Sequence, residues 1–131
     1  MGKGKLVEFT TRLETRQCAD AFRELMTSAR SGFGRVIGGV TFAPPDSSDD
    51  PFDALEERPV FEVVAHCPRN RFNKYGGYGI HLYVYEDGDR RRVHLGHRAV
   101  GFADVPSANG TLQKVLDGFR QLDASMQVVS G

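Results

Sequence analysis

The chain has 131 residues, of which 40% are hydrophobic and 26% charged, as expected for one soluble globular domain. Its 17 basic and 17 acidic residues cancel, which argues against nucleic-acid binding driven by overall charge, although a local basic patch stays open. The two cysteines, Cys18 and Cys67, exclude a disulfide framework and a paired-cysteine zinc motif.

The chain begins with a predicted strand and helix. Residues 6–14 alternate apolar and polar side chains, which is typical of a strand. Thr15 is expected to cap a helix that begins near Arg16 and ends at Ser31-Gly32. Apolar residues recur along this helix at helical spacing, namely Cys18, Phe22, Leu25, Met26 and Ala29.

The next segments predict two strands separated by an acidic loop. Residues 33–43 form a strand interrupted by Gly38-Gly39, which indicates a bend in a curved sheet or the close approach of a ligand. Residues 44–59 are rich in Pro, Asp and Ser, and we expect a solvated, mobile loop there. Residues 60–67 form a third strand, and a basic, glycine-ended connection follows at 69–77.

Residues 78–100 predict a β-hairpin, because two runs rich in Val, Ile, Tyr and Leu flank the turn pair Asp87-Gly88. The register implied by this turn places Ile80 opposite Leu95 and Leu82 opposite Val93 on an apolar face. The other face then carries three polar pairs: His81 with His94, Tyr83 with Arg92, and Tyr85 with Arg90.

A second helix is expected to start at Pro106-Ser107. Its apolar residues occur at steps of three and four: Leu112, Val115, Leu116, Phe119, Leu122 and Met126. Gly118 lies inside this pattern and indicates close packing. Residues 128–131 are expected to fray.

These elements predict a single α+β domain over residues 1–131, in the order β-α-β-β-β-β-α. We expect a five-stranded antiparallel curved sheet packed by two helices, with the long C-terminal helix across the sheet. In this order of elements the chain resembles the helix-grip fold of the Bet v 1 and START-like proteins, which usually have more strands and a longer chain. The resemblance implies a small apolar ligand held between the sheet and the C-terminal helix.

The polar hairpin face is the candidate binding surface, and it comprises His81, Tyr83, Tyr85, Arg90, Arg92 and His94. Interleaved tyrosines and arginines are favoured in protein interfaces and can also stack on RNA bases, while a plain solvated sheet face is the third interpretation. His81 and His94 are close enough in this register to meet one metal ion. Because no third ligand can be placed, we predict no metal site.

A weaker anion-binding candidate comprises Arg69, Arg71 and Lys74, beside a run of glycines whose backbone could hold an anion. Arg90 to Arg92 add a second basic cluster, and pairing with the acidic loop is the competing interpretation for both. His66 and Cys67 are adjacent, so in a strand their side chains point to opposite faces and form no nucleophile–base pair. We predict no catalytic residue and no cofactor.

The sequence leads to three functional hypotheses. The first is a non-enzymatic domain that acts through protein contacts, as a homodimer formed by the Tyr/Arg/His face or with another protein. The second is helix-grip-like binding of a small apolar ligand, and the third is RNA or anion binding by the basic turns. No stretch approaches the roughly 20 apolar residues of a membrane-spanning helix, and no signal-peptide core is present, so we expect a cytoplasmic protein.

Overall fold

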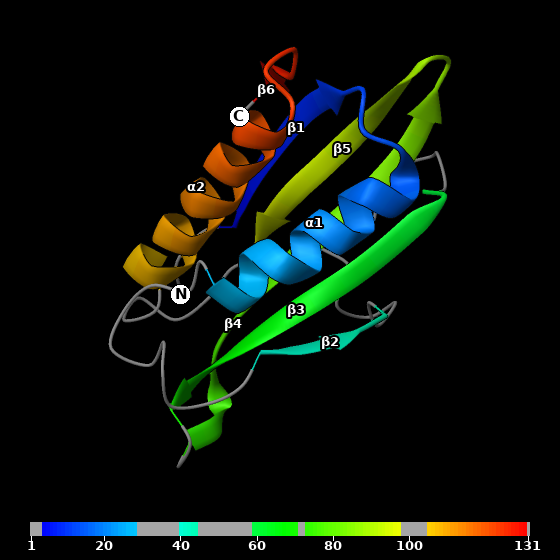
Figure 1. Ribbon diagram of the computed structural model, residues 1–131. Coiled ribbons are helices and arrows are strands. Elements are labelled where there is room, and N and C mark those ends of the chain that lie inside the picture. The colour runs from blue at the N-terminus through cyan, green and yellow to red at the C-terminus, as the bar shows by residue number, and fades with distance from the viewer. Residues whose placement is uncertain (1–3, 29–39, 45–58, 71–72, 98–104, 131) are drawn as a thin grey trace.

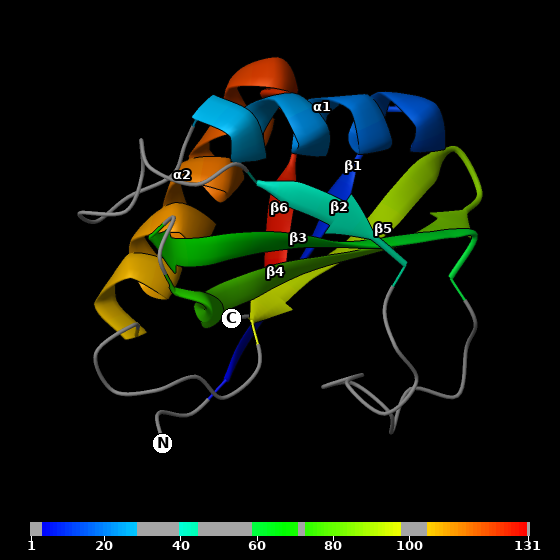
Figure 2. The same ribbon diagram turned by 90° about the horizontal axis from the view of Figure 1, so that it is seen from below.

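The computed structural model describes residues 4–28, 40–44, 59–70, 73–97 and 105–130 (Figure 1). The elements in chain order are β1 (Lys5–Thr11), α1 (Thr15–Ser28), β2 (Thr41–Ala43), β3 (Phe61–Asn70), β4 (Asn73–Asp87), β5 (Arg90–His97), α2 (Val105–Leu122) and β6 (Gln127–Ser130). The described strands form one antiparallel six-stranded sheet in the order β2-β3-β4-β5-β1-β6. Both helices lie on the same face of this sheet (Figure 2). The predicted α+β class is confirmed.

The sheet has six described strands instead of the predicted five, because the C-terminal residues pair and do not fray. Val128 lies opposite Phe9 of β1, and Gln127 lies opposite Thr10. Met126 is buried beyond the end of α2, so its helical spacing was misleading. Of the predicted strand 33–43, the structure describes a strand at Thr41–Ala43. Gly38-Gly39 and most of the acidic segment 44–59 lie outside the described residues.

Helix α1 starts one residue earlier than expected, and the prediction that Thr15 caps it is wrong. The N–H of Glu14 donates to Oε1 of Gln17 at 2.8 Å, while the carbonyl of Glu14 accepts from the N–H of Cys18. Glu14 is therefore the N-cap residue, and the side chain of Gln17, at the third helical position, accepts from its N–H as in one half of a capping box. The Thr15 hydroxyl is buried without a hydrogen-bond partner.

The core lies between the helices and the sheet. Four of the predicted apolar residues of α2 are buried, namely Leu112, Val115, Leu116 and Phe119. The rings of Phe9 and Phe119 lie 5.3 Å apart. Close packing at Gly118 is confirmed, because a Cβ atom there would overlap the side chain of Leu25 in α1. Leu122, predicted on the apolar stripe, is instead 57% exposed, because the helix ends there. None of the described helices is long and apolar enough to cross a membrane.

The β4–β5 hairpin turns at Gly88 and Asp89, one position later than predicted, and Gly88 has the positive φ of 69° that suits glycine. Leu82 consequently lies opposite Leu95, and Tyr83 lies opposite His94. The register differs from the predicted one by two residues. Because side chains alternate with a period of two, this shift changes the pairs and leaves both faces as predicted.

Candidate functional site

The predicted polar face lies on the side of the sheet away from the two helices. Its central side chains are buried, each being between 2% and 3% exposed: His81, Tyr83, Tyr85 and His94. Arg90 and Arg92 at its end are half-buried. The solvated-face interpretation is therefore wrong for these four residues, because alternation identifies which side chains share a face and not whether that face is covered. Their burial also removes them from the surface that a partner would meet.

Glu8 of β1 joins this face, and sequence reasoning missed it. Glu8 lies opposite His94 in the β1–β5 ladder, and its Oε1 is 2.6 Å from His94 Nε2. The same oxygen is 3.9 Å from the guanidinium of Arg92. A carboxylate at this position fixes the orientation of the imidazole ring. The alternation in 6–14 placed Glu8 on the polar side, but no local pattern shows that β1 pairs with β5.

Aromatic contacts complete the polar face. The guanidinium of Arg92 lies 4.7 Å from the centre of the Tyr85 ring, and the His94 ring lies 5.0 Å from it. His81 Nδ1 is 3.2 Å from the Tyr83 hydroxyl. Cation–π and aromatic contacts of this kind each stabilise a buried layer by about 1 kcal/mol. His94 Nδ1 is buried without a hydrogen-bond partner.

The two histidines do not face each other. His81 lies opposite Gly96, while His94 lies opposite Tyr83, so the imidazoles are diagonal neighbours with separate partners. Within the described ranges, no group of three His, Cys, Asp or Glu side chains is suited to hold a metal ion. The predicted pairing of His81 with His94 is wrong, because the prediction placed the turn one position too early and so shifted the register by two residues.

The anion-binding prediction falls at the end of the β3–β4 hairpin. The predicted connection 69–77 is mostly strand, since β3 runs to Asn70 and β4 begins at Asn73. Arg71 and the side chains of Arg69 and Lys74 lie outside what the structure describes, so this site stays a prediction.

In the second basic cluster, Arg90 to Arg92, two of the arginines form ion pairs with glutamates. Arg91 is buried, and it donates to Glu14 at 3.0 Å and to the carbonyl of Gly88 at 3.2 Å. Arg92 lies near Glu8, as described above. Partners from elsewhere in the chain thus occupy Arg91 and Arg92, which reduces what they could offer to a phosphate group.

Neither cysteine is placed as a nucleophile. Cys18 and Cys67 are both buried, and the Cys18 thiol lies 3.9 Å from the carbonyl of Leu13. Burial raises the pKa of the Cys18 thiol to about 11, and the positive charge of Arg91 offsets this only in part. A thiol that stays protonated is a weak nucleophile.

We predict that Cys18 makes stability fall at alkaline pH. Its pKa is higher in the folded chain than the ordinary value of 9.0, so its contribution is complete below pH 9 and is lost as the pH rises toward 11. Denaturant midpoints measured across this interval should fall more for the wild type than for Cys18→Ala. Parallel declines in the two proteins would contradict the assignment.

Three of the large exposed hydrophobic side chains come from neighbouring segments of the chain, the end of α2 and β6. The large hydrophobics exposed in the described part of the chain are Val60 at 55%, Leu122 at 57%, Val128 at 42% and Val129 at 58%. The last three lie at the end of α2 and on β6, and we call them the C-terminal corner. β6 forms one end of the described sheet and pairs there with β1 alone, through a bulge at Val129. It carries no charge or proline of the kind that protects edge strands.

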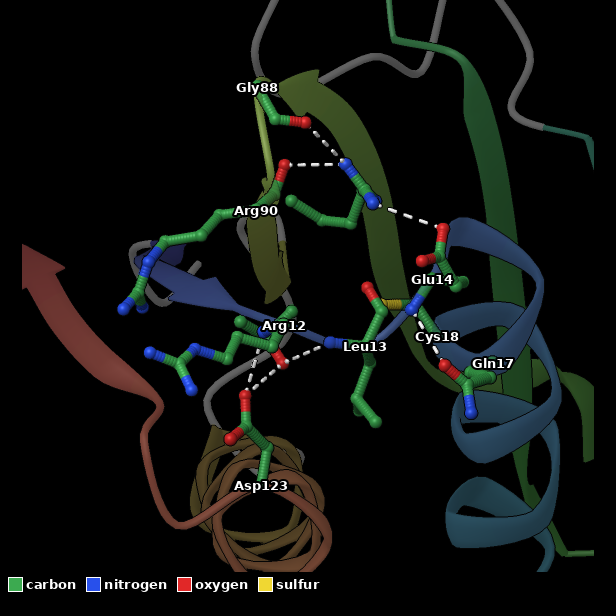
Figure 3. A network of polar contacts seen from close by, with 10 residues as sticks. Arg12, Leu13, Glu14, Gln17, Cys18, Gly88, Arg90 and Asp123 are labelled. Atoms are coloured by element: carbon green, nitrogen blue, oxygen red, sulfur yellow. Dashed lines mark hydrogen bonds and ion pairs between the residues drawn. The ribbon is translucent and has the colours of Figure 1, made fainter.

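Asp123 positions this corner. Its carboxylate accepts from the Thr11 hydroxyl at 2.7 Å and from the Arg12 N–H at 2.8 Å. Figure 3 shows Asp123 at the end of α2 reaching the segment that follows β1. Its other oxygen accepts from the N–H and hydroxyl of Ser125, so the chain turns from α2 into β6. One side chain thus ties the end of the helix to the strand beside which β6 lies.

The hydrogen bonds to Asp123 also set its ionisation. Partial burial opposes the charged form, but the bonds from the Ser125 hydroxyl, the Arg12 N–H, the Thr11 hydroxyl and the Ser125 N–H outweigh it. They hold the pKa of this carboxyl well below its usual range. The Asp123 carboxylate is therefore charged at neutral pH, where its hydrogen bonds to Thr11, Arg12 and Ser125 are strongest.

No family model, no curated protein and no solved structure matches the chain. None of these comparisons supports the helix-grip resemblance, and the described order of elements departs from the predicted one because β6 follows α2.

Proposed function

We propose that this domain is non-enzymatic and works by contacting another polypeptide at the C-terminal corner. The observation that supports this is the exposure of Leu122, Val128 and Val129 at the end of α2 and on β6, three of the four large exposed hydrophobics in the described residues. Single exposed hydrophobics are ordinary, whereas neighbouring ones on a sheet edge are typical of an interaction site. The proposal keeps the predicted mode of action and moves it away from the Tyr/Arg/His face, whose centre is buried.

The chemistry of a sheet edge indicates what would bind there. The outer side of an edge strand offers N–H and C=O groups to an extended segment, which then adds to the sheet as a further strand. Each such hydrogen bond contributes about 1 kcal/mol, and covering each half-exposed Val or Leu side chain contributes a similar amount. Because association itself costs at least about 4 kcal/mol, we expect a weak contact with a Kd in about the millimolar range.

The other two hypotheses have less support. An apolar ligand between sheet and α2 would have to separate Phe9, Val115 and Phe119, which are fully buried in one apolar cluster. RNA or anion binding would use Arg69 and Lys74, whose side chains are not described, while Arg91 and Arg92 already pair with Glu14 and Glu8.

The proposal is tested with a synthetic peptide of residues 123–131 as a model strand. Added in excess to isotope-labelled protein, it should shift the amide NMR signals of β6 and leave those of β2 unchanged. The double variant Val128→Lys/Val129→Lys should lose these shifts, since edge lysines discourage strand addition. Val60→Lys is the matched control, because Val60 is equally exposed but bonds to Val84 of β4, far from β6 in the sheet. Equal shifts in wild type and double variant would contradict the proposal.

A further inference from the structure

We infer that the polypeptide bound at the C-terminal corner is a second copy of this chain, with the two β6 strands antiparallel. This inference rests on the proposed function above and names its partner. It joins two six-stranded sheets into one continuous sheet. The described helices of both copies then lie on the same face, because the twofold axis that relates antiparallel edge strands is perpendicular to the sheet.

The surface is self-complementary. A twofold axis between the two β6 strands brings the side chain nearest the axis against the same side chain of the other copy, so Val128 or Val129 meets its own counterpart. Gln127–Ser130 contains no charged residue, and the whole chain has a net charge of zero. Two identical copies therefore approach without overall repulsion.

The geometry also indicates a closed dimer. At the opposite end of the described sheet, β2 has only three residues, and its outward-facing Thr41 and Ala43 are small. Phe42 of β2 points toward the helices, where its ring packs edge-on against Phe22. Among the described strands, the apolar edge thus occurs once, at β6, and pairing two copies uses both such edges. The bulge at Val129 limits regular pairing to a short stretch, which favours a pair over an extended assembly.

Self-disulfide formation tests this arrangement. Val128→Cys and Val129→Cys are made singly, because the axis passes close to one or the other, and each is oxidised at high protein concentration. One of them should form a covalent dimer at least tenfold faster than Val60→Cys, the control of similar exposure. The native thiols do not interfere, since Cys18 is 0% and Cys67 4% exposed. The cross-linked protein should keep the circular dichroism spectrum of the reduced protein.

The outcomes separate the two proposals. Shifts of the β6 amides by the peptide, with neither cysteine cross-linking faster than Val60→Cys, would leave the strand-binding edge intact and overturn the second copy as its partner. The absence of both results would overturn both proposals. Rapid cross-linking at Val128 or Val129 supports both.

Discussion

Replacing Phe119 with Ala should lower the free energy of unfolding by about 3–5 kcal/mol. Phe119 is fully buried, and its ring packs at 5.3 Å against Phe9 from the strand beneath it. Truncation removes both the apolar burial and this aromatic contact, and it leaves a cavity between α2 and the sheet. Urea unfolding followed by circular dichroism measures the change.

Leu122→Ala on the same helix is the matched control. Leu122 continues the apolar spacing of α2 by one further step, but it is 57% exposed at the helix end. We therefore expect a change within about 0.5 kcal/mol. Comparable losses in Phe119→Ala and Leu122→Ala would mean that α2 buries a different face from the one described.

Asp123→Ala should lower the free energy of unfolding by about 2–3 kcal/mol. The change removes a charged acceptor from the Thr11 hydroxyl and the Arg12 N–H, and bonds to charged groups are the stronger ones. The Thr11 side chain, which is buried, is left without this acceptor. Asp117→Ala is the control, because Asp117 is 52% exposed and its surface ion pair with Arg120 should contribute less than 1 kcal/mol.

The pH dependence of Asp123 has a defined sign. Its pKa is lower in the folded chain than in the unfolded chain, so the stability that it contributes is present above about pH 4 and is lost as the pH falls further. Unfolding midpoints between pH 2 and 7 should thus fall less steeply for Asp123→Ala than for the wild type. Asp117→Ala should show the same pH dependence as the wild type. Equal slopes of the unfolding midpoint against pH for the wild type and Asp123→Ala would contradict the role given to Asp123.

The side chains that share a face could be predicted from the sequence. Ile80, Leu82 and Leu95 face the helices as expected, even though the hairpin register is shifted by two residues. The reason is that side chains alternate between the two faces of a strand, so a register shift of two residues leaves each side chain on its face. The position of the turn decides which residues lie opposite one another. The buried stripe of α2 follows from its helical period for the same reason.

The candidate site itself could not be predicted, because it depends on contacts between distant segments. Glu8 reaches His94 only because β1 pairs with β5, and no local pattern states the order of strands in a sheet. β6 is four residues long, and it forms where Asp123 directs the chain back beside β1. Its two adjacent valines have high strand propensity, but a short run near a terminus is expected to fray until a partner strand is known.

Sedimentation velocity of the purified chain over a wide concentration range is the most direct test of self-association at the C-terminal corner. We predict a mass approaching twice the 14.5 kDa of one chain at high concentration and a return to 14.5 kDa on dilution. Val128→Lys/Val129→Lys should remain a monomer throughout, and Val60→Lys should behave like the wild type. A wild-type mass of 14.5 kDa at every concentration, or a dimer unaffected by the two lysines, would contradict the account.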